Sequence, residues 1–154
     1  MTKLMKILFG IGVVVAVVAI FYFNSGVEDA AVLQLPSEIE QAELVSRTIN
    51  VFAVSVNEKS MQKFYDHISS LWKKQLSVKK LDQAYGKLFG VVGANLTVLS
   101  HHRPHFSSQT VIDENGVLLL TGHYHTKPTS VLFQQKYIYE GLSWRLLGFS
   151  IDFK

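Results

Sequence analysis

The chain has 154 residues, no cysteine and a formal net charge of +3, from 15 basic and 12 acidic residues. Without cysteine it forms no disulfide bond and no acylated lipoprotein terminus, so its stability must come from an apolar core. Lys3 and Lys6 carry two of the positive charges, and the other 13 basic residues nearly balance the 12 acidic ones. This balance excludes the strong basic excess that is typical of a nucleic-acid-binding domain.

A long apolar run stands near the N-terminus. Residues 7–27 comprise 21 residues without a charge, and as a helix they would be about 31 Å long, the thickness of the hydrocarbon core of a bilayer. Lys3 and Lys6 precede the run, whereas Glu28 and Asp29 follow it. Positive charge before a membrane span indicates a cytoplasmic N-terminus.

We therefore predict a cytoplasmic tail over residues 1–6 and a transmembrane anchor over residues 7–27 in the inner (plasma) membrane. The rest of the chain would lie on the periplasmic or extracytoplasmic side. The alternative is a cleaved signal peptide, but its apolar core usually has only about 7–15 residues. Bulky aromatic residues at positions 21–23 also do not fit the small residues of a cleavage site.

Residues 28–36 are predicted to form a linker, and residues 37–154 are enough for one compact domain. A helix of about 20 residues is expected to begin after Ser37, because Glu40 stands at the capping-box spacing. Apolar residues then recur at steps of three and four, which predicts one buried stripe. These residues are Ile39, Ala42, Val45, Ile49, Phe52 and Val56.

Two further helices are expected. One begins near Ser60, and a second follows Ser77 and stops at Gly90, a typical C-terminal residue. The predicted buried faces are Met61, Phe64, Ile68 and Leu71 on the first, and Leu81, Ala84, Tyr85, Leu88 and Phe89 on the second.

After Gly93 the pattern predicts strands. Asn115-Gly116 is a strong hairpin-turn signal, and residues 131–139 alternate between apolar and polar. The expected strands are residues 96–100, 110–112, 117–121, 131–139 and 144–153. Helices followed by strands predict an α+β domain in which about three helices pack on one face of a curved antiparallel sheet.

This order resembles the NTF2-like (cystatin-like, cone-shaped) superfamily, in which a curved sheet wraps around N-terminal helices. The likeness spans residues 37–153 and is most specific in residues 116–128 and 144–148, with helical segments such as Ser70-Leu71-Trp72 similar to small bacterial proteins of that superfamily. The resemblance implies the fold rather than an activity, because the superfamily includes isomerases, dehydratases, binding modules and secretion-machine subunits.

Histidines are the first candidates for chemistry. His123 and His125 are two residues apart and would share a face of a strand, as two metal ligands require. A third ligand could come from His101 or His105 if their strand lies alongside. However, Pro104 predicts a loop for that segment, and no spacing matches a zinc signature. We therefore expect no metal and no cofactor.

Carboxylates and aromatic residues are the remaining candidates. Asp66 beside His67, Asp82 and Asp152 could serve an enzyme, but the helical positions of Asp66 and Asp82 are otherwise polar and predict solvated groups. Four aromatic residues could line the mouth of a cone and hold an apolar ligand. These are Tyr124, Tyr137, Tyr139 and Trp144.

The sequence thus favours a membrane-anchored, extracytoplasmic binding or assembly module of the cell envelope. Its partners would be the membrane, through the N-terminal helix, and other envelope proteins or a second copy of the chain. The alternative is a small cone-fold enzyme of the isomerase or dehydratase type that acts on an apolar small molecule. A buried ionisable group in a closed cavity would favour the enzyme, and a filled core with an exposed apolar patch would favour the binding module.

Overall fold

The computed structural model describes residues 33–90, 93–127 and 130–154. In these segments no helix combines the length and the apolar character that a membrane crossing requires. The predicted tail and anchor, residues 1–27, lie outside the described residues, as does most of the predicted linker.

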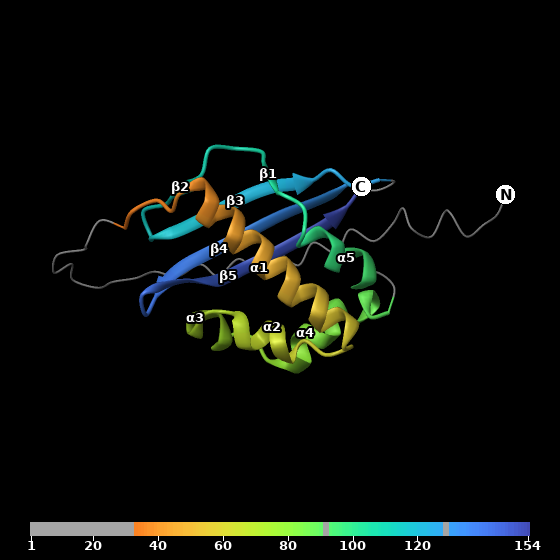
Figure 1. The fold of residues 1–154 in the computed structure, drawn as a ribbon. Helices are drawn as coiled ribbons and strands as arrows, with labels where there is room; N and C mark the ends of the chain where they lie inside the picture. Colours follow the sequence, from red (N-terminus) through yellow and green to blue (C-terminus); the bar gives the residue numbers. More distant parts are fainter. Residues whose placement is uncertain (1–32, 91–92, 128–129) are drawn as a thin grey trace.

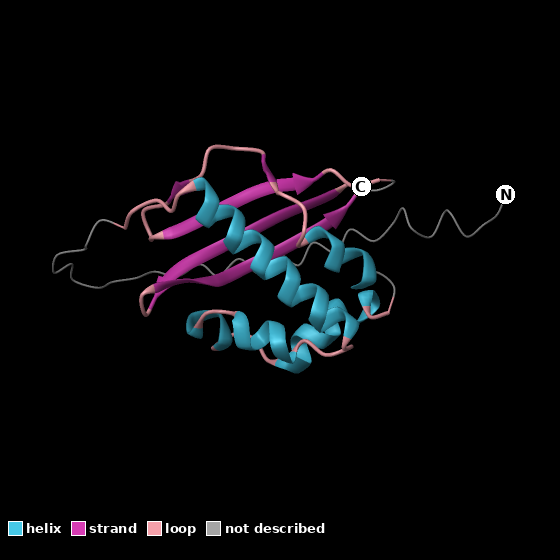
Figure 2. Ribbon diagram, viewed as in Figure 1, coloured by secondary structure: helices cyan, strands magenta, loops and turns pink. Residues whose placement is uncertain are grey.

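The domain is α+β, and its helices pack on one face of a curved antiparallel sheet (Figures 1 and 2). The helix α1 crosses the strands, and a group of shorter helices lies beside it. The helices are α1 (Glu38–Asn57), α2 (Gln62–His67), α3 (Ser70–Lys73), α4 (Val78–Tyr85), the 3-10 helix η2 (Gly86–Leu88) and α5 (Gly93–Leu99).

The sheet has the strand order β1-β3-β4-β5, with β2 also paired to β3. All of these named strand pairs are antiparallel. The strands are β1 (His105–Phe106), β2 (Val111–Ile112), β3 (Val117–Tyr124), β4 (Val131–Glu140) and β5 (Ser143–Phe153).

The predicted turn between β2 and β3 is confirmed. The Asp113 carboxylate accepts hydrogen bonds from the backbone N–H groups of Asn115 and Val117, each at 2.9 Å. Gly116 has a φ of 74°, which a glycine adopts without steric cost. The strands predicted at residues 131–139 and 144–153 are confirmed as β4 and β5.

The capping prediction for α1 is confirmed, whereas the expectation for Ile39 is wrong. The Ser37 hydroxyl accepts from the Glu40 N–H, and the Glu40 carboxylate accepts from the Ser37 N–H. Ile39 is 68% exposed, because the residue that the first turn of α1 buries is Gln41. Gln41 donates to Pro36 O at 2.7 Å and accepts from Thr110 Oγ1 at 2.6 Å, and residues two apart on a helix point to nearly opposite sides.

The second predicted helix is interrupted. Ile68 has an extended backbone and forms a bridge with Leu146 of β5. Ser69 N donates to Leu146 O at 2.7 Å, and the Ser69 hydroxyl then caps α3 by accepting from Trp72 N. As a result Trp72, rather than Leu71, is buried on α3.

The strand predicted at residues 96–100 is also wrong, because this segment belongs to α5. Leu96 and Leu99 are both buried, and their spacing of three residues places them on the same side of a helix but on opposite faces of a strand. Leu-Thr-Val-Leu has strand propensity, and packing against α1 overrides it.

An aromatic cluster fills the space between the helices and the sheet. The Phe52 ring lies 5.5 Å from that of Phe64, 5.1 Å from that of Tyr85 and 4.7 Å from that of Phe149. These residues belong to α1, α2, α4 and β5. Edge-to-face contacts of this kind add to the free energy gained from burial, so the cluster joins four elements in one core.

A glycine sets the position of β1. A Cβ atom at Gly122 would collide with the carbonyl oxygen of His105 and would lie 2.7 Å from the Phe133 ring. Only a residue without a side chain lets β1 approach β3 this closely. This approach places His105 directly opposite His123 in the antiparallel register.

Candidate functional site

The structure separates the four aromatic candidates into two pairs. Tyr124 and Tyr137 are fully buried under the helices. Tyr139 and Trp144 face each other near the β4–β5 turn, with ring centroids 5.3 Å apart, and Tyr139 is 43% exposed. The four therefore do not form one mouth, and only the second pair offers surface to a ligand.

A polar network in the core was not foreseen from the sequence. The Thr48 hydroxyl lies 3.1 Å from His67 Nε2 and 2.8 Å from the Tyr137 hydroxyl. The Tyr137 hydroxyl in turn contacts Leu44 O at 2.9 Å and the Gln135 side-chain oxygen. The chain of contacts leads from the end of α2, across α1, into the sheet.

The direction of these hydrogen bonds follows from the acceptors at the inner end. A carbonyl oxygen accepts only, so Tyr137 donates its single proton to Leu44 O or to Gln135. Thr48 must then donate to Tyr137, and His67 Nε2 must donate to Thr48. This assignment leaves His67 Nδ1 with a free lone pair, as in a neutral imidazole.

Electrostatics keeps this imidazole neutral. Burial, together with the positive charges of Arg47 and Arg145, lowers the pKa of His67 to about 4. Burial raises the pKa of Tyr137 far above its usual value. Both groups therefore remain uncharged at neutral pH.

The carboxylate candidates do not meet in this network. Asp66 is exposed and accepts from the Gln62 amide at 3.0 Å. Asp82 is half-buried and accepts from the backbone N–H of Met61 at 2.7 Å, where it supports the start of α2. Asp152 lies on β5 opposite Leu132. The predicted solvated state is confirmed for Asp66 but is wrong for Asp82, which is half-buried and hydrogen-bonded to the backbone.

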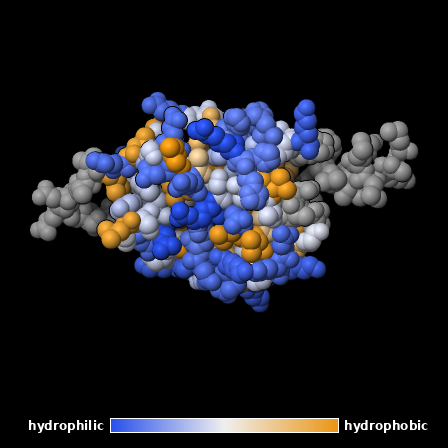
Figure 3. All heavy atoms as spheres, in the orientation of Figure 1, coloured by the Kyte–Doolittle hydropathy of each residue, from blue (hydrophilic) through white to orange (hydrophobic). Residues whose placement is uncertain are grey.

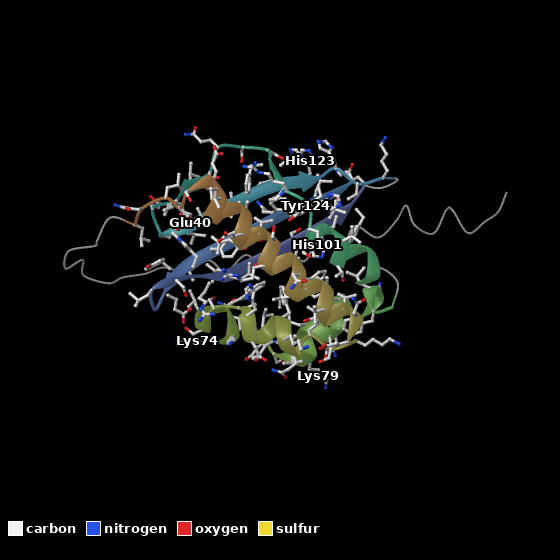
Figure 4. The ribbon with its side chains drawn as sticks, viewed as in Figure 1. Glu40, Lys74, Lys79, His101, His123 and Tyr124 are labelled. Atoms are coloured by element: carbon white, nitrogen blue, oxygen red, sulfur yellow. The ribbon has the colours of Figure 1, made fainter. Side chains whose placement is uncertain are left out.

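An open groove lies beside the first turns of α1. It has a volume of about 450 Å³ and separates α1 from the segment that joins α5 to β1. Most of its lining surface is apolar, although the lining residues include one acidic, one basic and two histidine side chains. The lining residues are Ile39, Ala42, Glu43, Ser46, His101, His102, Arg103 and Pro104. In Figure 4 the labelled His101 lies close to α1 on this side.

A buried hydroxyl without a partner lies under this groove. Tyr124 Oη is fully buried and makes no hydrogen bond with any described residue. Burial raises the pKa of Tyr124, while the nearby Ser46 hydroxyl, without a well-formed hydrogen bond, acts to lower it. Ser46 also lines the groove, so this tyrosine lies near the groove floor.

His105, His123 and His125 gather at the end of β3, where Figure 4 labels His123. His123 Nε2 and His125 Nε2 are 3.1 Å apart. The His105 ring is stacked on that of His123 at 5.6 Å and meets the edge of His125 at 4.8 Å. The strand that carries His105 thus lies alongside, which is the condition for a third ligand. His101 lies elsewhere, at the groove.

Comparisons with known proteins give no relative. No family model, no curated protein and no solved structure matches this chain.

Proposed function

We propose that this protein is a membrane-anchored binding or assembly module of the cell envelope, with an NTF2-like domain on the extracytoplasmic side. The anchor over residues 7–27 is inferred from the sequence alone. The observation that carries the binding function is the open, mainly apolar groove between α1 and residues 101–104.

The shape of the groove favours a polypeptide segment as its occupant. A small-molecule site usually buries roughly 70–90% of the surface of its ligand. An open groove leaves more of a small ligand exposed to solvent. Ile39 offers an exposed apolar side chain, while Glu43 and Arg103 supply charges of opposite sign. An apolar segment with charges of both signs, from another envelope protein, fits this combination.

The filled core supports the same conclusion. The cluster around Phe52 and the buried tyrosines occupies the space between helices and sheet, where a cone-fold enzyme would hold its substrate. The face of the domain drawn in Figure 3 carries separate hydrophobic patches among mainly hydrophilic residues. A function that depends on the surface of the domain therefore fits this structure better than one that depends on an internal cavity.

Photo-crosslinking in intact cells tests the groove. A photoreactive residue in place of Ile39, in the full chain, is expected to give one discrete adduct, and mass spectrometry identifies the protein that it contains. Ala42→Arg in the same chain should suppress the adduct, because its side chain would fill the groove. The purified occupant should then bind the full chain at least tenfold more weakly after Ala42→Arg.

Leu142 provides the matched control, since it is 93% exposed and lies in the β4–β5 turn away from the groove. The photoreactive residue at this position is expected to give no such adduct, and Leu142→Arg should leave binding unchanged. An adduct between two copies of the chain would instead assign the groove to a homo-oligomer. The absence of any adduct from Ile39 would refute the proposal.

The polar network favours an enzyme as the second candidate. His67 is neutral, its Nδ1 is free to accept a proton, and Thr48 and Tyr137 hold the ring in place. A general base needs a fixed orientation and a lone pair, but a pKa of about 4 makes this imidazole a weak base at neutral pH, so the enzyme ranks second.

A further inference from the structure

We propose that His105, His123 and His125 bind one divalent transition-metal ion, such as zinc, at the end of the β1–β3 pair. The site is separate from the groove and from the polar network, and nothing in the proposed function depends on it. The sequence offered His105 as a third ligand but predicted a loop for its segment, whereas the pairing of β1 with β3 places it opposite His123.

Two of the ligands are already placed. A zinc ion lies about 2.0–2.1 Å from each histidine nitrogen, and tetrahedral geometry then sets two such nitrogens about 3.3 Å apart. His123 Nε2 and His125 Nε2 are separated by 3.1 Å. In this contact one Nε2–H donates a hydrogen bond to the other nitrogen, and a bound ion would replace that proton at nearly the same nitrogen–nitrogen spacing.

The third ligand requires one small movement. Among the described residues no group of three His, Cys, Asp or Glu side chains is placed to hold a metal ion, so the site forms only if the His105 ring turns towards the other two. Its centroid is 4.8 Å from that of His125, and the side chain is exposed. Rotation of an exposed ring meets little steric resistance, and Gly122 holds the β1 backbone against β3.

The donor set selects the class of metal. Neutral imidazoles suit zinc, copper and nickel ions, whereas magnesium and calcium prefer oxygen ligands. Three protein ligands leave the fourth position of a tetrahedral ion for water. The exposure of His105 and His125 keeps that position open to solvent.

Calorimetric titration of the full chain, purified in detergent without a histidine tag, tests this site with zinc chloride alone. We expect saturable binding of one zinc ion per chain and no binding of magnesium chloride. His123→Gln and His105→Gln should each weaken zinc binding at least tenfold. His102→Gln is the matched control, because it changes an exposed histidine of the neighbouring groove and should leave the dissociation constant unchanged.

A thermal melt gives a second measurement that does not depend on the heat of binding. Zinc should raise the melting temperature of the parent and of His102→Gln, and it should not raise that of His123→Gln. All three substitutions affect solvent-accessible side chains, so folded variants are expected. The proposal is overturned if the parent shows no saturable zinc binding, or if His105→Gln binds zinc as tightly as the parent.

Discussion

Thr48 is the residue that links the polar and apolar parts of the core. It interrupts the apolar stripe of α1 with a hydroxyl that is fully buried, and a buried hydroxyl is stable only when it is hydrogen-bonded. His67 and Tyr137 satisfy it from opposite sides. The protonation state of His67 is therefore coupled to the stability of the fold.

This coupling predicts a specific pH dependence. The pKa of His67 is about 4 in the folded protein, against 6.5 for an unperturbed histidine. Above pH 6.5 the ring is neutral in both states, whereas between pH 6.5 and about 4 only the unfolded state binds the proton. The free energy of unfolding should therefore fall as the pH is lowered through this range, by up to about 3 kcal/mol.

His67→Gln should remove this part of the pH dependence. Urea unfolding at pH 7.5, 5.5 and 4.5 measures it as the difference between the parent and the variant, so that the titration of other groups cancels. His102→Gln, which changes an exposed histidine, should keep the dependence of the parent. If the parent and His67→Gln lose the same free energy between pH 7.5 and 4.5, the ring is not held neutral by the fold.

The positions of candidate functional residues were predicted correctly only where they depend on neighbours along the chain. His123 and His125 were placed together because they are two residues apart in a strand. His67 was considered only as the neighbour of Asp66, and its partial burial follows from the end of α2 and the bridge between Ile68 and Leu146. A pattern of neighbouring residues cannot predict this contact, because Leu146 lies far from Ile68 along the chain.

The same distinction holds for the elements. The start of α1 was predicted correctly because Ser37 and Glu40 form its cap within four residues. Residues 96–99 were misassigned because their local propensity favours a strand, while contacts with α1, about 40 residues earlier in the chain, stabilise a helix. Caps and turns can be read locally, but the partner of a short apolar segment cannot.

The aromatic cluster leads to a prediction at this scale. Phe52→Ala removes a fully buried ring that contacts α2, α4 and β5, and such truncations cost about 3–5 kcal/mol. This is a large part of the roughly 5–15 kcal/mol that stabilises a domain. Chemical denaturation of the full chain should show the domain nearly unfolded without denaturant.

Ile39→Ala is the matched control on the same helix. Ile39 is 68% exposed, and substitutions at exposed positions usually change stability by less than about 0.5 kcal/mol. Equal losses from Phe52→Ala and Ile39→Ala would mean that the first turn of α1 contributes to the core as much as its centre, contrary to the packing described above.

At the scale of the molecule, the proposed functions occupy different surfaces of one domain. The groove lies on the helical side at the start of α1, while the histidine cluster lies where β1 meets the end of β3 (Figures 1 and 4). The aromatic core between them joins α1, α2, α4 and β5 into one unit. A domain of this kind can bind a partner on one surface without rearranging the other.

The charges around the N-terminal apolar run predict the side of the membrane on which the domain lies. Lys3 and Lys6 precede the uncharged run of residues 7–27, and acidic residues follow it. The cost of moving the basic end across the membrane favours an N-terminus in the cytoplasm. A reporter that is active only outside the cytoplasm, fused after Lys154, should therefore be active, and the protein should remain in the membrane fraction after extraction with alkaline carbonate.

Two comparisons make this test decisive. Replacing Val14 and Val17 by Arg should abolish both membrane retention and reporter activity, because each charge near the centre of a span costs about 2.5–3.5 kcal/mol on insertion scales. The same reporter fused after Lys6 should be inactive. Recovery of a soluble product that begins near Val27 would instead show that the segment is a cleaved signal peptide, and the domain would then act as a free extracytoplasmic protein.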